Sequence, residues 1–457
     1  MIDKNKIPID AIEVLNILKQ NGYSAYLVGG CVRDLCLGKE PKDYDICTSA
    51  IPEKVMNIFK PTHNVIETGL KHGTITLIAD HLYIKNALRI PIEVTTFRSD
   101  GDYSNGRRPD SVKFGVTVQE DVSRRDFTIN GLLYDSEKVI DYVGGLKDLK
   151  NKTICAVGDP WDRYQDDHLR MMRCIRFACQ LNFNIEEYTF LAIKYKCSLI
   201  KNISQERIKD ELCKILLSDR PAEGIQLLEK SGLLQYILPE LQECVGFDQH
   251  NYHHRKNVFD HILKVLDATP CSLNLRLASL LHDIGKPKTF TIDENNIGHF
   301  YSHHIVGFDM SEEILKRLKF DNNTIDNVRI LVREHMSRYP KLRTNSIKKL
   351  INRVGKNNID DLINLQIADI IGSKPPYEFE DIINLKKEIQ RVLDAKEPLS
   401  VKDLAINGHD LMSVGIQPGK RMGEILNELV EIVLKDPELN IKEKLLEIVK
   451  NDFQKPL

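Results

Sequence analysis

Residues 27–46 read LVGGCVRDLCLGKEPKDYDI, and this stretch decides the fold of the first part of the 457-residue chain. A short apolar strand runs into a Gly-Gly turn, a helix follows, and a second strand carries Asp43 and Asp45. Alternate side chains of a strand share one face and lie roughly 7 Å apart, so the two carboxylates can project together. Gly29 and Gly30 can bring bare backbone N–H groups to a phosphate at the start of the helix. This order of elements predicts a metal-dependent site for nucleotide transfer.

The glycine turn differs from a Walker A loop, because no Gly-Lys-Ser/Thr sequence follows it. Arg33 lies one helical turn further on. A later strand-like stretch, IEVTTF at 92–97, adds Glu93 as a candidate third catalytic carboxylate, or as a solvated or ion-paired strand residue. Nucleotidyl transfer depends on charge neutralisation and in-line positioning. We therefore expect Asp43 and Asp45 to hold two Mg²⁺ ions.

Several blocks along the chain resemble, in the same order, the bacterial CCA-adding tRNA nucleotidyltransferases and their poly(A) polymerase relatives, the class II branch of the polymerase-β-like superfamily. Beyond residues 27–46, the blocks are TGLKHGT (68–74), IEVTTFR (92–98), RRDFTIN (124–130), GGLKDL (144–149) and ERIKDEL (206–212). The resemblance implies an α+β head of the polymerase-β-like nucleotidyltransferase type, followed by an all-α body. It also implies template-independent addition of C, C and A to the 3′ ends of tRNA from CTP and ATP.

By the same resemblance, one group of residues holds the nucleotide: Gly29, Gly30, Arg33, Arg125, Asp126 and Asn130. Arg125 has a structural alternative, since an Arg-Arg-Asp run is often a surface ion-pair cluster. The stretch 98–114 is rich in Gly, Asp, Ser and Arg and predicts a mobile loop. The resemblance associates such a loop with enzymes that complete the whole triplet.

The segment RYQDDHLRMMRCIRFA (163–178) has a helical pattern, with Asp167, Arg170, Arg173 and Arg176 at three-residue spacing. The resemblance implies that Asp167 and Arg170 read the base. A carboxylate accepts from the exocyclic amine of cytosine or adenine while a guanidinium donates to the ring nitrogen, whereas guanine and uracil present the reverse polarity. Arg173 and Arg176 would face the phosphates or support the helix. The alternative is an arginine-rich solvated helix, and His168 stands where the family usually has proline.

A second set of motifs resembles the HD phosphohydrolase superfamily: VFDHILKVL (258–266), LLHDIGKP (280–287), FYSHHIVG (300–307), LVREHM (331–336) and QIADIIG (366–372). The adjacent His282 and Asp283, joined by His261 and Asp369, would form a mixed nitrogen and oxygen site for a second divalent metal. His303 and His335 would complete a second position. The site could act as a phosphatase or cyclic phosphodiesterase on RNA ends, or the helical bundle could keep its ligands without turnover.

These motifs predict a head over residues 1–150, a helical neck and body over 151–245, an HD helical domain over 246–375 and a helical tail over 376–457. The net charge of −2 confines any RNA-binding surface to local patches. Ten cysteines occur without a C-x-x-C pair, which favours free thiols in a reducing cytoplasm. No signal peptide or apolar run of membrane-spanning length is evident, so no membrane partner is expected. The sequence does not indicate an oligomeric state.

Other functions are compatible with the same motifs. A poly(A) polymerase, or a partial enzyme that adds only CC or only A, would use the same Asp167 and Arg170. Alternatively, the HD region is the working phosphohydrolase and the head only holds RNA. A pure RNA-binding protein would show no divalent-dependent turnover at all.

Overall fold

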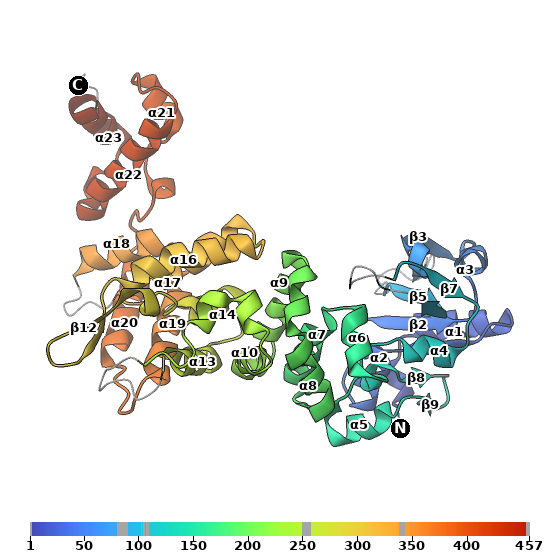
Figure 1. The fold of residues 1–457 in the computed structure, drawn as a ribbon. Helices are drawn as coiled ribbons and strands as arrows, with labels where there is room; N and C mark the ends of the chain where they lie inside the picture. The colour runs from blue at the N-terminus through green and yellow to red at the C-terminus, as the bar shows by residue number, and fades with distance from the viewer. Residues whose placement is uncertain are drawn as a thin grey trace. The chain divides into compact units, whose positions relative to one another are not determined.

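The computed structural model describes residues 2–79, 90–101, 103, 106, 109–248, 257–337 and 343–453. The chain divides into two compact units, Met1–Pro239 and Glu240–Leu457, whose elements are coloured along the chain in Figure 1. The division falls a few residues before the expected start of the HD domain at 246. Among the described residues, no helix combines the length and the apolarity that crossing a bilayer requires. All ten cysteines are free thiols, as predicted.

The first unit is built on a mixed sheet whose described strands follow the order β3–β4–β5–β2–β1–β8–β9. These strands are Ala25–Val28 (β1), Tyr44–Thr48 (β2), His63–Gly69 (β3), Thr74–Ala79 (β4), Ile92–Thr96 (β5), Leu133–Tyr134 (β8) and Val139–Ile140 (β9). The central strands β2 and β5 run parallel, while β2 and β1 run antiparallel. Along β5 the side chains of Ile92 and Val94 are buried and that of Glu93 is exposed, the period of two expected for a strand with one face in the core.

Helices surround the sheet and continue as the neck and body. Those of the head are Ile9–Gln20 (α1), Gly30–Cys36 (α2), Pro52–Phe59 (α3), Val118–Ser123 (α4) and Gly145–Asn151 (α5). Those that follow are Pro160–Asp166 (α6), Arg170–Leu181 (α7), Glu187–Lys196 (α8), Gln205–Leu216 (α9), Pro221–Lys230 (α10) and Leu234–Ile237 (α11), with a short parallel pair, Thr153–Ile154 (β10) and Asn184–Ile185 (β11). Helices α1 and α2 pack on β1 and β2, and α7 packs on α9 and α10. The α+β head followed by a helical body is therefore confirmed.

One local prediction in this unit is wrong, and the loop predicted over 98–114 is too long at both ends. The segment 163–178 is two helices rather than one, because Asp167 adopts an extended backbone (φ −131°, ψ 105°) between α6 and α7. The Asp167 carboxylate then accepts a hydrogen bond from the backbone N–H of Leu169 at 3.2 Å, a local bond that competes with helix formation. The stretch 98–114 begins and ends in strands, Arg98–Asp100 (β6) and Val112–Phe114 (β7), which pair antiparallel. Between them, positions 102, 104–105 and 107–108 lie outside the described residues.

The second unit is helical, with one small hairpin. Its described helices before residue 400 are Pro239–Gln242 (α12), Val258–Ala268 (α13), Leu273–Leu281 (α14), Lys286–Thr289 (α15), His303–Arg317 (α16), Asn322–Glu334 (α17), Thr344–Val354 (α18), Ile359–Gly372 (α19) and Glu380–Asp394 (α20). Phe290–Ile292 (β12) and Gly298–Phe300 (β13) form the hairpin. Helices α13, α14, α17 and α19 pack against one another, and α20 packs on α18 and α19.

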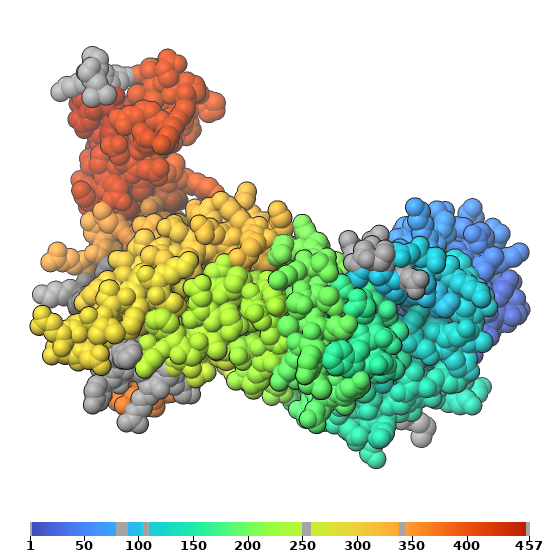
Figure 2. Space-filling view, viewed as in Figure 1, coloured from blue at the N-terminus to red at the C-terminus, as the bar shows by residue number. Residues whose placement is uncertain are grey.

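The chain ends in a small helical module of its own. It contains Gly408–Ser413 (α21), Lys420–Lys435 (α22) and Lys442–Ile448 (α23), whose residues gather together in red in Figure 2. Leu411, Leu429 and Leu445, one from each helix, are fully buried in one apolar cluster. This module therefore has its own core, and it lies within the expected tail of 376–457.

Candidate active site and metal centre

Three carboxylates meet at the middle of the sheet in the first unit. The parallel register of β2 and β5 places Asp45 directly beside Glu93, so the two side chains leave the same face. Asp43 is exposed and lies one residue before β2 begins. Burial, followed by the charges of Asp43 and Glu93, raises the pKa of Asp45 to about 6. A bound divalent cation would offset the repulsion among these carboxylates and favour their ionised forms.

The glycine turn lies against this cluster. Gly29 has φ +81°, a backbone conformation that favours glycine. A Cβ atom at Gly29 would lie 3.5 Å from Arg125 Nη1 and 4.0 Å from Asp45 Oδ2, so a guanidinium and a carboxylate both border the turn. The expectation that both glycines offer bare amides is wrong for Gly29, whose N–H donates to the carbonyl of Leu132 at 3.2 Å. Because Gly29 has no side chain, it leaves room for Arg125 beside Asp45.

A relay of polar side chains, buried except for Arg173, joins the head to α7. Arg33 Nη1 donates to Asn130 Oδ1 at 2.7 Å, and Asn130 Nδ2 donates to Asp126 Oδ1 at 3.1 Å. Arg173 closes the relay, because its Nε and Nη2 donate to Asp126 Oδ2 at 2.9 and 2.5 Å. Asp126 and Arg173 therefore bind each other, and the predicted nucleotide contact at Arg33 is oriented from the helical neck.

Three guanidinium groups also pack around the buried ring of Phe177. The guanidinium carbons of Arg33, Arg173 and Arg176 lie 5.2, 5.7 and 4.1 Å from the ring centroid, within the range of cation–π attraction. Arg176 additionally pairs with Glu211 of α9 at 2.8 Å. Among the two roles considered for Arg173 and Arg176, these contacts fit support of the helix. Sequence reasoning missed Phe177, whose only signal was its place next to Arg176.

Arg125 belongs to a buried ion-pair cluster that the sequence did not single out. Asp121 is fully buried and pairs with Arg125 at 3.2 Å and with Arg124 at 2.6 Å. Burial would raise the pKa of Asp121, but Arg125 and Arg124 outweigh it and hold the pKa below its usual value. The available signal was the spacing of three and four residues from Asp121, in α4, to Arg124 and Arg125 just past the end of that helix. Arg125 is thus anchored on one side while its Nη1 reaches the glycine turn.

The expected base-reading pair is engaged with protein partners in this structure. Asp167 pairs with Arg207 of α9 at 3.3 Å. Arg170 pairs with Asp166 at 3.6 Å and donates to the backbone carbonyl of Arg124 at 2.9 Å. The block at 206–212, which had no assigned role, therefore supplies Arg207 to Asp167, and Arg170 is tied to the head through a backbone carbonyl.

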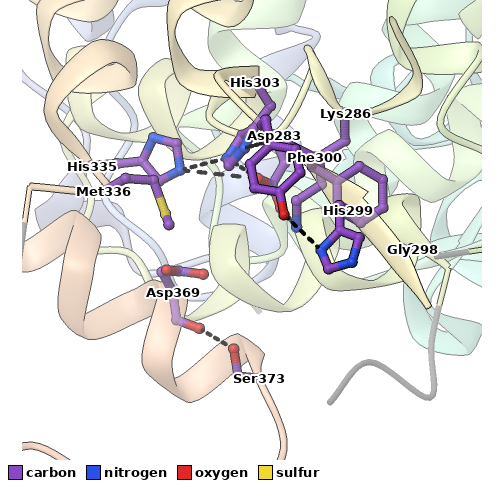
Figure 3. A pocket seen from close by; sticks show the side chains of 11 residues that line it. Asp283, Lys286, Gly298, His299, Phe300, His303, His335, Met336, Asp369 and Ser373 are labelled. Carbon is purple, nitrogen blue, oxygen red and sulfur yellow. Dashed lines mark hydrogen bonds and ion pairs between the residues drawn. The ribbon is translucent and has the colours of Figure 1, made fainter. Parts of the chain in front are cut away.

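In the second unit, the structure brings all six expected HD residues into one buried cluster. Asp283 lies between two groups: its Oδ2 is 3.3 Å from His282 Nε2 and 3.5 Å from His261 Nε2. Its Oδ1 is 3.4 Å from His303 Nε2 and 3.9 Å from His335 Nε2. Two triads therefore share Asp283, and in each of them the possible ligand atoms lie within 4.8 Å of one another. Figure 3 shows the members of the second triad, Asp283, His303 and His335, facing one another.

The sixth residue, Asp369 of α19, joins the first group. Its Oδ1 lies 3.1 Å from His261 Nε2 and 3.9 Å from His282 Nε2. The cluster is thus assembled from α13, α16 and α19 and from the turns that follow α14 and α17. His282 and Asp283 lie just past the end of α14 rather than within it.

The imidazoles are oriented as metal ligands are. Nδ1 of His282, His303 and His335 each contacts a backbone carbonyl, at 2.8, 2.8 and 2.6 Å, so in the neutral ring Nδ1 carries the proton. The Nε2 atoms of His303 and His335 then face each other across 3.3 Å, beside Asp283 Oδ1. Burial, and next the charge of His282, lowers the pKa of His335 to about 3, which keeps that ring neutral. Imidazole nitrogens that converge beside a carboxylate in this way fit a divalent metal.

Gly285 and Lys286 complete the surroundings of this cluster, and sequence reasoning assigned neither. A Cβ atom at Gly285 would lie only 2.3 Å from the backbone oxygen of His303, so glycine lets α16 approach. Lys286 is buried, and its Nζ lies 2.7 Å from Asp283 Oδ2. The three-residue spacing between Asp283 and Lys286 was the available signal.

Three family models match successive parts of the chain. The model described as "Poly A polymerase head domain" matches residues 25–155, and "Probable RNA and SrmB- binding site of polymerase A" matches residues 182–244. A model of tRNA nucleotidyltransferase domain 2 matches residues 302–449. The matches therefore extend over both units.

Full-length relatives show the same range of similarity. The CCA-adding enzyme of Ligilactobacillus salivarius (strain UCC118) is 34% identical over 445 residues, which cover 96% of this chain and 95% of that protein. The CCA-adding enzyme of Levilactobacillus brevis is 35% identical over 419 residues, or 91% of each chain. The crystal structure of the Bacillus stearothermophilus CCA-adding enzyme in complex with CTP superposes with a TM-score of 0.70 at 27% identity, covering 96% of this chain and 97% of that one. The likeness thus runs from the head to the tail.

Proposed function

Because the chain belongs to the family of CCA-adding enzymes, we propose that it builds the 3′-terminal C-C-A of tRNA from CTP and ATP at the carboxylate cluster of its head. The observation that carries the proposal is the pairing of Asp45 with Glu93 in adjacent parallel strands, bordered by Gly29 and Arg125. Carboxylates beside a guanidinium suit a site that must bind both metal and triphosphate. A tRNA substrate is also our reason for proposing a cytoplasmic location.

The nucleotidyltransferase fold implies a divalent metal, and we propose Mg²⁺ held by Asp43 and Asp45 with Glu93 as the third carboxylate. The raised pKa of Asp45 supports this assignment, since a bound cation would offset the mutual repulsion of the three groups. When bound, such ions would activate the attacking 3′-hydroxyl and neutralise the triphosphate. The positions of Asp43, Asp45 and Glu93 would determine where the positive charge of the bound ions lies.

Cationic side chains of the head would orient the triphosphate. Arg125 is fixed by Asp121 and borders the glycine turn, and Arg33 is held by Asn130. For base selection we propose Asp167 and Arg170, as the resemblance implies. Both have protein partners here, so binding of a base would exchange those partners for the Watson–Crick edge. Arg170→Ala should then lose discrimination against GTP and UTP more than it loses turnover.

The decisive experiment uses a tRNA transcript that lacks its terminal triplet, with CTP alone, ATP alone or both, read at nucleotide resolution. We expect growth by three nucleotides that then stops, and only with both nucleotides. Glu93→Gln and Asp45→Asn should abolish this growth, while the exposed Glu53→Gln of α3 in the same head should leave it unchanged. A lengthening ladder with ATP alone would instead mean poly(A) synthesis, and growth that stops after two cytidines would mean a partial enzyme.

A second function is favoured by the metal cluster of the second unit. Two triads that share Asp283, with imidazoles oriented by backbone carbonyls, support an HD-type phosphohydrolase site. His261, His282, Asp283 and Asp369 would hold one ion, and Asp283, His303 and His335 the other. Such ions would activate water toward a phosphate ester. Asp283→Asn should abolish phosphatase activity and spare nucleotide incorporation, and Asp45→Asn should do the reverse.

A further inference from the structure

The segment 38–43 connects α2 to β2 and ends in Asp43, one of the proposed metal ligands. Asp43 precedes both ladders that hold β2 in the sheet: β5 pairs with β2 from Tyr44 onward, and β1 pairs with it from Ile46 onward. Asp45 and Glu93 are therefore fixed by strand pairing. Asp43 is exposed and lies outside that pairing, so its position depends on how the segment 38–43 is held.

Tyr44 anchors the end of this segment from the opposite face of the sheet. Because side chains alternate along a strand, Tyr44 leaves the face of β2 that is opposite to Asp45. Its side chain is buried, and its hydroxyl donates to the backbone carbonyl of Lys6 at 2.7 Å. The residue next to Asp43 is thus tied to the N-terminal part of the chain.

Lys6 holds the start of the same segment. Its Nζ donates to the backbone carbonyl of Gly38 at 2.6 Å, so one residue contacts the segment 38–43 at its start and the strand directly after its end. Lys6 is the last residue of a 3-10 turn, Lys4–Lys6, in which the N–H of Ile7 donates to the carbonyl of Lys4 at 3.1 Å. The buried side chain of Ile7 fixes this turn to the head.

We propose that Lys6 and Tyr44 are positioning residues for metal binding, because together they hold the segment 38–43 so that the Asp43 carboxylate stays beside that of Asp45. The inference rests on the nucleotidyl transfer proposed above, and it gives the N-terminal turn a part in that reaction. Mg²⁺ requires near-ideal octahedral geometry at short distances to its ligands. Displacement of one of its two carboxylates would therefore weaken its binding.

The first test measures the binding of Mn²⁺ to the full chain without nucleotide. Electron paramagnetic resonance counts the free Mn²⁺ during a titration, and the binding that Asp45→Asn removes is that of the head. Tyr44→Phe and Lys6→Met should each weaken this binding by about 2- to 10-fold, the change in Kd that corresponds to the net contribution of one hydrogen bond. Lys6→Arg keeps a donor at this position and should restore the binding.

Two variants serve as matched controls. Tyr134→Phe removes another buried tyrosine hydroxyl of the same sheet, which donates to the backbone carbonyl of Ser136 at 3.0 Å. Lys4→Met removes an exposed lysine from the same 3-10 turn. Neither control should change the binding of Mn²⁺. A general loss of stability would affect Tyr134→Phe as much as Tyr44→Phe, so the difference between the two variants reports the position of Asp43.

Trypsin reports on the segment itself, because Lys39 and Lys42 within it are exposed. Tyr44→Phe and Lys6→Met should raise the rate of cleavage after these two lysines by about 2- to 10-fold under native conditions, since local opening becomes more favourable. In the tRNA extension assay, the same variants should raise the Mg²⁺ concentration that gives half of the maximal rate. The kcat at saturating Mg²⁺ should stay unchanged, because the ligands themselves remain.

The outcomes separate this inference from the proposed function. If tRNA is extended but Tyr44→Phe and Lys6→Met leave both Mn²⁺ binding and the Mg²⁺ requirement unchanged, the inference is overturned and the function stands. Equal weakening by Tyr134→Phe would also overturn the inference. If tRNA is not extended but Tyr44→Phe and Lys6→Met selectively weaken the Mn²⁺ binding that depends on Asp45, the proposed function fails and the positioning role stands.

Discussion

Asp126→Asn should destabilise the first unit by about 3 kcal/mol. Asp126 Oδ2 accepts from Arg173 Nε and Nη2 at 2.9 and 2.5 Å, while Oδ1 accepts from Asn130 and from the backbone N–H of Phe127. An asparagine amide must turn its NH₂ group toward one of these sets of donors. Removing one partner of a buried ion pair costs about 3–5 kcal/mol. The low end applies because the Arg173 side chain is 36% exposed and can be rehydrated.

The single tryptophan makes this measurement specific to one unit. Trp161 lies in α6, with its ring 5.3 Å from that of Tyr195, so its fluorescence in a urea titration follows the first unit alone. A double-mutant cycle with Arg173→Met should give a coupling energy of about 1–3 kcal/mol. As a matched control, Asp210→Asn removes an exposed carboxylate that is 3.7 Å from Lys209 and should change stability by less than about 0.5 kcal/mol.

The reasoning about this pair is refuted if the coupling energy falls below about 0.5 kcal/mol, or if Asp126→Asn is as mild as Asp210→Asn. The buried relay would then contribute no net stability. Its contacts would only orient Arg33, and the effect of Asp126→Asn would appear in the KM for CTP and ATP instead of in the urea midpoint.

Three further outcomes are expected. Arg125 and Arg124 hold the pKa of Asp121 below its unfolded value despite burial, so its stabilising contribution is complete above about pH 4 and is lost as the pH falls through the folded pKa. The urea midpoint of Asp121→Asn should therefore be lower than that of the unchanged protein at pH 7 and should fall less on acidification. Parallel pH profiles of the two proteins would contradict this. Asp283→Asn should remove both metal ions and His261→Ala only one, as measured by elemental analysis of the purified protein, whereas two ions retained in Asp283→Asn would refute the shared ligand. Gly285→Ala should lower the metal content, because its Cβ would lie 2.3 Å from the backbone oxygen of His303 and push α16 away; unchanged metal content would show that the helix can yield.

Local sequence order was sufficient for the elements that carry the chemistry. The strand, glycine turn, helix and strand of residues 27–46 appear as β1, α2 and β2, because strand and helix periodicity are properties of neighbouring residues. For the same reason, Ile92–Thr96 is a strand with Glu93 on its exposed face. The ligands of the HD cluster could also be identified from the sequence, because six histidine and aspartate residues stand at the positions of the motif.

Partners across the fold were not predictable in this way. Nothing near Asp126 indicates that its partner is Arg173, or that Asp167 would end a helix and pair with Arg207. A helical pattern extends through Asp167, yet the structure breaks there, because a local carboxylate hydrogen bond and a partner from another helix replace the helical turn. Such outcomes depend on which helices pack together.

By itself, the sequence determined which residues carry charge, which can bind a metal and where strands and helices form, because these follow from side-chain chemistry and from periodicity over a few residues. The tertiary structure alone decided that Glu93 stands beside Asp45, through the parallel pairing of β2 and β5, and that Asp283 serves two groups of ligands at once. Both depend on contacts between residues distant in the chain, and such contacts are selected by the burial of whole elements rather than by any local pattern.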